Sequence, residues 1–312
     1  MSAVRFFSYA KLNLTLNITG VRDGYHLLDS FVTSVDLSDE IVLRKRKDAL
    51  IGVTMHGFNS ENIPPEQNAA QRAGEAFVKK YGVKGADITV FKNIPMGAGL
   101  GGSSADAAGV LGGMSKLYGV EDETGLKELA DGLGSDTGYM LRGGFARMTE
   151  RGTKIWKLQR FAELWFLLLC PKTPVSTGAC YAAYDAAPDG ARKDTERCID
   201  AFLRGNYAET AKCFYNALYM PASRLNPSVE RALNEAAALS PLGCGMSGSG
   251  SAVFAMFETR ELCEWARSRY RGDCRAYVVK TVEPAELLEK EKKKIRWRNP
   301  FVLTKEETDA FK

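Results

Sequence analysis

The sequence predicts an α+β fold in which helices and strands alternate and the strands pair mainly antiparallel. Residues 11–18 alternate strictly between apolar and polar side chains, as expected for a strand with one buried face. A second alternating stretch, residues 31–43, follows a turn at residues 20–24, so a hairpin-like connection is expected. Residues 66–81 carry apolar side chains at helical spacing. This mixture fits α+β better than a doubly wound parallel sheet.

The remaining elements are predicted from the same signals. We expect strands at residues 88–91, 146–148, 165–169, 252–257 and 276–279. We expect one helix directly after the glycines of residues 97–102 and further helices at residues 126–133, 178–184, 195–203, 207–219, 226–238 and 261–270. We predict an N-terminal domain over residues 1–148, a C-terminal domain over residues 149–285 and a charged tail over residues 286–312.

The composition is that of a globular protein: 45% of the residues are hydrophobic and 26% are charged. The longest strongly apolar run, residues 164–170, is far shorter than the ~20 residues of a membrane helix, and the N-terminus lacks the apolar core of a signal peptide. We therefore expect a cytoplasmic protein without a membrane partner. The net charge of +4 lies mostly at the C-terminus. A solvated tail explains it better than a nucleic-acid contact.

Cysteine and histidine usage limits the metal chemistry. The seven cysteines contain no Cys-x-x-Cys pair, which favours reduced thiols over disulfides or zinc. The only histidines, His26 and His56, exclude a histidine-rich metal site. We therefore expect no metal site built from a side-chain cluster.

A glycine-rich loop at residues 93–108 joins the strand at residues 88–91 to a helix. Its glycines allow positive φ and close approach of a ligand, and Ser103 or Ser104 is expected to cap the helix. A helix N-terminus binds anions, so we expect a nucleotide phosphate there. Three generic interpretations compete. A dinucleotide loop lacks its acidic residue at the end of a second strand, a Walker loop lacks its lysine after Gly102, and a purely structural loop stays open.

Three other features carry polar chemistry. Lys11 begins the polar face of the first strand. This face could be exposed to solvent at the edge of the sheet or could line a cleft. Asp136 lies between glycine-rich turns and could simply be a helix N-cap. A second glycine-serine loop at residues 243–251 precedes the strand at residues 252–257.

Six blocks in this order resemble the motifs of the GHMP kinases, a family of small-molecule kinases. They are residues 10–14, 22–26, 94–102, 133–136, 175–177 and 246–250, which read Ala-Lys-Leu-Asn-Leu, Arg-Asp-Gly-Tyr-His, Ile-Pro-Met-Gly-Ala-Gly-Leu-Gly-Gly, Leu-Gly-Ser-Asp, Val-Ser-Thr and Met-Ser-Gly-Ser-Gly. The resemblance implies a two-domain fold, ribosomal-protein-S5-domain-2-like at the N-terminus and ferredoxin-like at the C-terminus, with the active site in the cleft between them.

The resemblance also implies roles for the matched residues. Lys11 and Asp136 are expected to be catalytic, Asp136 as the base that receives the substrate proton and Lys11 between it and the transferred phosphoryl group. Mg²⁺ is expected on the phosphates of ATP, near Ser103 or Ser104. The expected ATP-binding residues are Pro95, Met96, Gly97, Ala98, Gly99, Leu100, Gly101, Gly102, Ser103, Ser104, Asn68 and Lys92. The expected substrate-binding residues are Asn13, Tyr25, His26 and Tyr181, and the supporting loop contributes Gly245, Ser247, Gly248, Ser249 and Gly250.

The implied reaction is the ATP-dependent phosphorylation of the 2-hydroxyl of 4-diphosphocytidyl-2-C-methyl-D-erythritol, in the non-mevalonate (MEP) pathway to isoprenoids. The block at residues 23–26 selects this substrate, because Tyr25 and His26 are expected to hold its cytosine. ATP and Mg²⁺ are the implied cofactors, and the implied partner is a small molecule that carries cytidine diphosphate, with no nucleic acid. A kinase for another small alcohol and a catalytically weak nucleotide-binding relative are the alternatives.

Two segments depart from the pattern of the family. Residues 101–106 read Gly-Gly-Ser-Ser-Ala-Asp in place of Gly-Gly-Gly-Ser-Ser-Asp. Thr137 and Gly138 follow the acidic residue where the family commonly has Val-Pro. Without the proline, the turn that aims the Asp136 carboxylate is less restricted.

Overall fold

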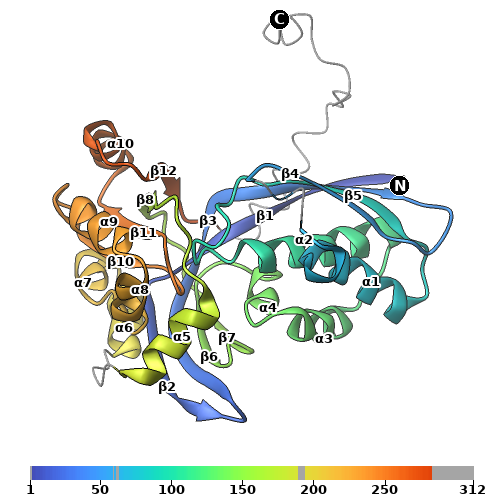
Figure 1. The fold of residues 1–312 in the computed structure, drawn as a ribbon, viewed down its shortest axis with the longest axis horizontal. Coiled ribbons are helices and arrows are strands. Elements are labelled where there is room, and N and C mark those ends of the chain that lie inside the picture. Colours follow the sequence, from blue (N-terminus) through green and yellow to red (C-terminus); the bar gives the residue numbers. More distant parts are fainter. Residues whose placement is uncertain (1, 59, 61–62, 189–193, 283–312) are drawn as a thin grey trace, which may run out of the picture.

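A computed structural model describes residues 2–58, 60, 63–188 and 194–282 of the chain. Within these residues the strands form an eight-stranded sheet and a four-stranded sheet. Helices α1 to α4 lie on one side of the larger sheet, whereas most of the later helices gather around the smaller sheet (Figure 1). The predicted α+β class is confirmed, and the predicted tail at residues 286–312 lies outside the described residues.

The larger sheet is built around β3 (Tyr25–Lys45), which pairs with four other strands. Its other strands are β1 (Ala3–Asn13), β2 (Thr15–Arg22), β4 (Gly52–His56), β5 (Ala86–Phe91), β6 (Ala146–Glu150), β7 (Lys154–Lys157) and β9 (Tyr215–Asn216). The predicted hairpin turn is present, with positive φ at Asp23 and Gly24. The single strand predicted over residues 11–18 is wrong, because Leu14 separates β1 from β2; its N–H donates to the carbonyl oxygen of Phe31.

The helices of the first half pack on this sheet through an apolar core. They are η2 (Pro65–Gln67), α1 (Ala69–Tyr81), α2 (Gly102–Tyr118), α3 (Glu123–Leu133) and α4 (Thr137–Met140). The helix predicted from residue 66 starts later because the Asn68 side chain accepts hydrogen bonds from the N–H groups of Ala70 and Gln71. The predicted capping of α2 by Ser103 or Ser104 is also wrong. Gly101 is the N-cap, with φ of 74°, and no side chain caps this helix.

The smaller sheet has the order β10-β11-β8-β12 and is antiparallel throughout. Its strands are β8 (Trp165–Cys170), β10 (Gly243–Met246), β11 (Val253–Phe257) and β12 (Arg275–Lys280). The helices of this half are α5 (Thr177–Ala186), α6 (Thr195–Leu203), α7 (Tyr207–Lys212), α8 (Tyr219–Leu225), α9 (Ser228–Ala237) and α10 (Arg260–Arg269). The helix predicted over residues 207–219 is wrong: it ends at Lys212, and β9 then pairs in parallel with β2.

The two halves share a core, and β9 of the second half pairs with β2 of the larger sheet. One buried apolar cluster contains Phe31 and Phe145 from the first half together with Phe202 and Phe254 from the second. The predicted division after residue 148 falls within β6, and β7 pairs with β6 in the larger sheet. We therefore propose that the first half extends through β7.

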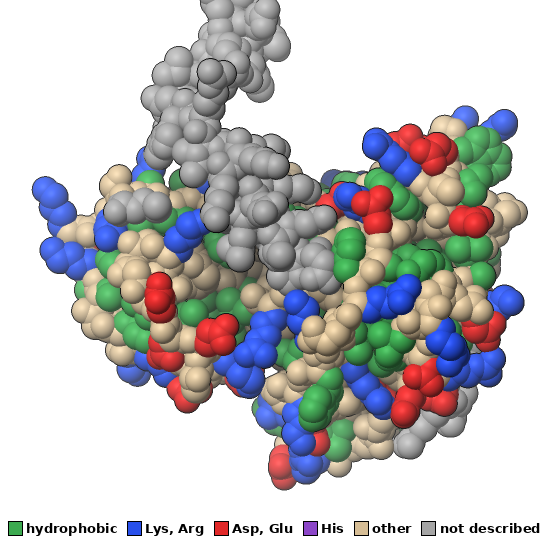
Figure 2. Space-filling model, turned by 180° about the vertical axis from the view of Figure 1, so that it is seen from behind, with side chains coloured by type: hydrophobic (Ala, Val, Ile, Leu, Met, Phe, Trp, Pro, Cys, Tyr) green, Lys and Arg blue, Asp and Glu red, His purple; other side chains and the backbone are tan. Residues whose placement is uncertain are grey.

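The surface shows no large area of one charge on the visible part of the back face, where basic and acidic side chains are interspersed (Figure 2). Among the described helices, none has both the length and the apolar character needed to cross a bilayer.

Candidate active site

A cavity of about 750 Å³ lies where the two glycine loops meet. Most of the predicted site residues line it, namely Lys11, Asn13, Tyr25, His26, Asn68, Lys92, Asp136, Tyr181, Gly248, Ser249 and all of residues 95–104. The predicted residues Gly245, Ser247 and Gly250 do not line it.

Glycine is required where the first loop approaches the second. Gly97, Gly99 and Gly101 all have positive φ. A Cβ atom on Gly99 would lie 2.1 Å from the carbonyl oxygen of Ser247, and one on Gly248 would lie 2.8 Å from that of Gly99. No side chain fits at either position, so the two loops can only pack this closely with glycine at both.

Hydrogen bonds fix the second loop against the first half. The Ser247 hydroxyl donates to the carbonyl oxygen of Gly99 over 3.0 Å, and the Gly248 N–H donates to Asn13 Oδ1 over 3.0 Å. Behind the loop, Asn216 Nδ2 donates to the carbonyl oxygens of Met246 and Gly248, each over 2.8 Å. The buried Asn216 side chain, which was not among the predicted site residues, thus holds the loop in its shape.

Lys11 and Asp136 come together at the centre of the cavity. Lys11 Nζ lies 3.4 Å from Asp136 Oδ2 and donates a hydrogen bond to Asn13 Oδ1. Lys11 is only 4% exposed, whereas 30% of the Asp136 side chain is accessible. The carboxylate therefore neutralises a buried ammonium group and can still contact a ligand. Asp136 occupies the N-cap position of α4, as the helix-cap interpretation predicted, but its side chain makes no capping hydrogen bond.

Aromatic side chains form the far end of the cavity. The rings of His26 and Tyr181 lie 4.6 Å apart between centroids, and His26 Nε2 is 2.7 Å from Asp185 Oδ1. The guanidinium carbon of Arg151 lies 3.4 Å from the centroid of the half-exposed Tyr25 ring. Burial raises the pKa of the Tyr181 phenol well above its usual value, so this ring enters the site uncharged. This end suits a flat, polar-edged ligand such as a nucleobase.

Comparison with known proteins agrees with this geometry. Family models match residues 68–145 as the GHMP kinases N terminal domain and residues 198–269 as the GHMP kinases C terminal region. A 4-diphosphocytidyl-2-C-methyl-D-erythritol kinase from Caldicellulosiruptor saccharolyticus is 38% identical over 257 residues, which cover 81% of this chain and 88% of the relative. One from Pelotomaculum thermopropionicum is 34% identical over 88% of this chain and 96% of its own length. The chain belongs to the GHMP kinase family.

Solved structures support the same assignment. A crystal structure of 4-(cytidine 5'-diphospho)-2C-methyl-D-erythritol kinase matches with a TM-score of 0.74 and 30% identity, covering 89% of this chain and 99% of that one. The mevalonate kinase of Methanococcus jannaschii has a TM-score of 0.66 at 15% identity, covers 90% of this chain and 99% of its own, and shows the shared fold alone. The predicted resemblance to a GHMP kinase, and with it the prediction of a small-molecule kinase, is confirmed.

In this GHMP kinase, a buried ionic cluster supports the first glycine loop. Lys92 Nζ contacts Asp39 and lies 2.7 Å from Asp106 Oδ2, and all three residues are at most 7% exposed. Asp39 Oδ1 also accepts hydrogen bonds from the N–H groups of Asn93 and Ile94, where the loop begins. Lys92 was among the predicted ATP-binding residues, whereas neither aspartate was predicted to belong to the site.

The residues after Asp136 form a fixed turn without the proline of the family pattern. The Thr137 N–H donates to the carbonyl oxygen of Gly134 over 3.0 Å, and the Met140 N–H donates to that of Asp136 over 2.9 Å. Thr137 is fully buried. Backbone hydrogen bonds and packing therefore restrict this turn where the ring of a proline would otherwise do so.

Two residues of the site were missed for different reasons. Arg151 lies in a turn, where no periodic pattern indicates which way a side chain points. Asp185 lies four residues after Tyr181 in α5, so helical spacing could have placed the two on one face.

Replacing Asp106 with asparagine should remove a pH dependence of stability. Burial raises the pKa of the Asp106 carboxyl to about 7, against about 4 in the unfolded chain. The folded chain therefore retains a proton that the unfolded chain loses, and the free energy of unfolding falls as pH rises across this range, by at most about 1.4 kcal/mol per pH unit. Denaturant titration of Asp106→Asn at about pH 5 and about pH 8 should not show this fall.

Asp122→Asn is the control for this measurement. A hydrogen bond from the Gly125 N–H lowers the pKa of Asp122, so this carboxyl is ionised in both states above about pH 5. Its removal should change stability equally at both pH values. A constant difference between Asp106→Asn and the native protein would show that Asp106 does not take up the proton.

Proposed function

We propose that the chain transfers the γ-phosphoryl group of ATP to the 2-hydroxyl of 4-diphosphocytidyl-2-C-methyl-D-erythritol. The observation that carries this proposal is the position of the Lys11–Asp136 pair in the cavity. Lys11 lies beside Gly101 of the first glycine loop, and Asp136 lies close enough to Tyr181 of the aromatic end to act on its phenol. The named relatives act on this substrate. We also propose the MEP pathway and the cytoplasm as the setting, with no nucleic-acid or membrane partner.

The first glycine loop is the proposed site of the ATP phosphates. Gly101 to Ser104 form the N-terminus of α2, whose unpaired N–H groups favour an anion. Asn68 and Lys92 line the same cavity on the side of α1 and β5. In the described residues, no group of three or more His, Cys, Asp or Glu side chains could hold a metal. Mg²⁺ bound to the phosphates would neutralise charge, and the Ser103 or Ser104 hydroxyl is the proposed protein ligand.

The proposed transfer uses groups that are already in place. As the substrate oxygen bonds to the γ-phosphorus, the bond to the oxygen bridging the β- and γ-phosphates breaks, and ADP leaves with that electron pair. Asp136 receives the hydroxyl proton, and Lys11 offsets the negative charge of the transferred group. Asn13 fixes the Lys11 ammonium by accepting its hydrogen bond. Positioning and charge neutralisation provide most of the catalysis in phosphoryl transfer.

The aromatic end is the proposed cytosine site. Tyr25, His26 and Tyr181 present flat faces and polar edges that can stack on a base and hydrogen-bond to it. A simpler alcohol has no base for these residues to bind.

Incubation of the pure protein with Mg·ATP and the cytidyl substrate, followed by mass spectrometry, should show a singly phosphorylated product. Turnover of mevalonate or homoserine in its place would contradict the proposal, and no turnover would indicate a nucleotide-binding relative.

Asp136→Asn should lower kcat by about 10²- to 10⁴-fold, because the substituted amide cannot accept the proton. ATP binding, measured by calorimetry, should be retained, since Asp136 is not among the proposed ATP contacts. Asp131→Asn, an exposed change on the preceding helix, is the control and should keep kcat. A fully active Asp136→Asn would exclude Asp136 as the base.

His26→Ala should raise KM for the cytidyl substrate about tenfold, which corresponds to the loss of one stacking contact and one hydrogen bond. KM for ATP should stay the same. His56→Ala, which removes a histidine that stacks on Phe91 and does not line the cavity, is the matched control. An unchanged KM for the cytidyl substrate in His26→Ala would contradict the proposed base site.

A further inference from the structure

The polar face that begins at Lys11 continues out of the cavity and ends on the second half of the molecule. Lys11, Asn13, Thr15 and Asn17 are each at most 5% exposed. Buried polar groups require hydrogen-bond partners, and each missing partner is unfavourable. Asn13 and Lys11 bond to each other in the lining of the cavity, whereas Thr15 and Asn17 both contact Thr195, at the start of α6.

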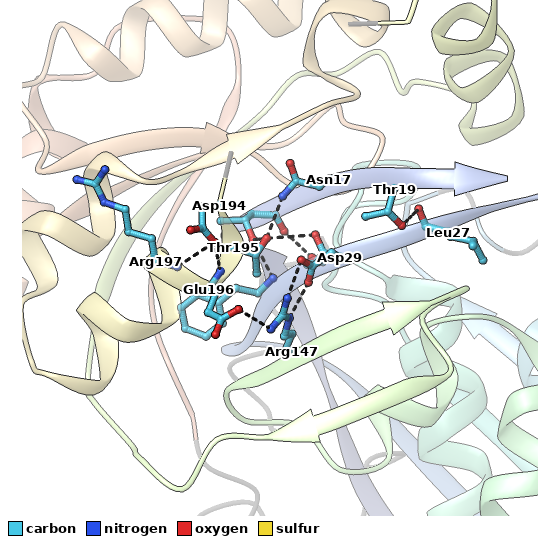
Figure 3. A network of polar contacts seen from close by, with 12 residues as sticks. Asn17, Thr19, Leu27, Asp29, Arg147, Asp194, Thr195, Glu196 and Arg197 are labelled. Atoms are coloured by element: carbon cyan, nitrogen blue, oxygen red, sulfur yellow. Dashed lines mark hydrogen bonds and ion pairs between the residues drawn. The ribbon is translucent and has the colours of Figure 1, made fainter. Parts of the chain in front are cut away.

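The Thr195 hydroxyl has three partners and is inaccessible to solvent, since the residue is 2% exposed. Its Oγ1 accepts from Asn17 Nδ2 over 2.9 Å, lies 3.1 Å from Thr15 Oγ1 and is 3.4 Å from the carbonyl oxygen of Asp29, to which it can donate (Figure 3). Because Thr15 Oγ1 already accepts from the Phe31 N–H, its own hydrogen is free for Thr195. A valine at position 195 would therefore remove the contacts of this hydroxyl with Asn17, Thr15 and Asp29.

Hydrogen bonds connect this hydroxyl to the reactive lysine. Ser30 Oγ donates to the carbonyl oxygen of Thr15, and Asn13 Nδ2 donates to Ser30 Oγ over 2.8 Å. Asn13 Oδ1 in turn accepts from Lys11 Nζ and from the Gly248 N–H. Thr15 thus links the two parts of this network: its hydroxyl contacts Thr195 of α6, and its carbonyl oxygen connects to Asn13 through Ser30.

The start of α6 contacts both β3 and β6. Asp194 caps the helix by accepting from the N–H groups of Glu196 and Arg197, over 2.9 and 3.2 Å. Arg147 of β6 makes two hydrogen bonds to Asp29, over 2.8 and 2.9 Å, and lies 3.8 Å from Glu196 (Figure 3). A planar guanidinium in such a two-bond contact restrains orientation as well as distance. Arg147 thus joins Asp29 of β3 to the first turn of α6, next to Thr195.

We propose that Thr195 is a positioning residue, which acts from the second half through Thr15, Ser30 and Asn13 to hold Lys11 against Asp136. The proposal rests on the proposed kinase function. On this proposal the contact of α6 with the larger sheet affects the reaction, although Thr195 itself does not line the cavity. A small displacement of reacting groups lowers the rate without weakening ligand binding, so the effect should appear in kcat.

The test compares Thr195→Val with Thr195→Ser and Thr210→Val. Thr195→Val should lower kcat about tenfold, while KM for ATP and for the cytidyl substrate changes less than about twofold. Thr195→Ser keeps the hydroxyl and should restore kcat. Thr210 is also fully buried, and its hydroxyl donates within α7 to the carbonyl oxygen of Asn206, so Thr210→Val removes a buried hydroxyl of the same half outside the network. It should lower Tm and leave kcat unchanged.

Amide hydrogen exchange tests the positioning without any substrate. In Thr195→Val the amide hydrogens of the peptide that covers residues 11–18 should exchange faster, because this peptide contains the Asn13 N–H that donates to Ser247. In Thr210→Val the same peptide should stay protected from exchange. Unchanged exchange there, or equal kcat losses in the two valine variants, would overturn the proposal. A native protein that fails to phosphorylate the cytidyl substrate would instead contradict the proposed function, and the exchange result would still decide the role of Thr195.

Discussion

A buried ammonium group sets the arrangement of this active site. Lys11 is almost inaccessible, and an unpaired charge in such a position would be strongly destabilising. Asp136 and Asn13 compensate for it, and Asn13 can do so only because Gly248 and Ser30 hold its side-chain amide. The requirement for partners therefore extends from one lysine to both halves of the molecule.

This requirement explains why the two glycine loops touch. The Gly248 N–H reaches Asn13 only if the second loop lies against the first, and a Cβ atom at Gly99 or Gly248 would prevent that approach. The cluster of Lys92 with Asp39 and Asp106 restrains the first loop from the other side, where Asp39 holds its opening N–H groups. The same contacts therefore compensate the buried charges and fix the shape of the proposed phosphate site.

The sequence predicted local features well and long-range partners poorly. The strand, glycine loop and helix around residues 88–118 could be found because their signals are consecutive in the chain. Leu14 was missed because the alternation continues through the break between β1 and β2. Ser103 and Ser104 suit a cap by type, yet Gly101 occupies that position in the left-handed conformation, where a Cβ atom would lie 2.2 Å from Met140 Cε.

Residues that act across the two halves carry no local signal. Thr195 was correctly placed at the start of a helix, but nothing near it in sequence indicates that its hydroxyl meets Thr15 and Asn17. Asn216 was assigned to a helix because residues 207–219 have apolar residues at helical spacing, whereas pairing with β2 makes it part of a strand. Lys11 and Asp136 could be paired from the sequence only through the resemblance to the GHMP kinases, because that resemblance joins motifs that lie far apart in the chain.

The central claim is that Lys11 and Asp136 act on a hydroxyl placed between the phosphate loop and the aromatic end. A crystal structure with a non-hydrolysable ATP analogue and the cytidyl substrate tests it most directly. We expect the γ-phosphate at the N-terminus of α2, the cytosine at His26 and the 2-hydroxyl within about 3.2 Å of the Asp136 carboxylate. A hydroxyl held away from Asp136, or a nucleobase of the substrate bound elsewhere, would contradict the account.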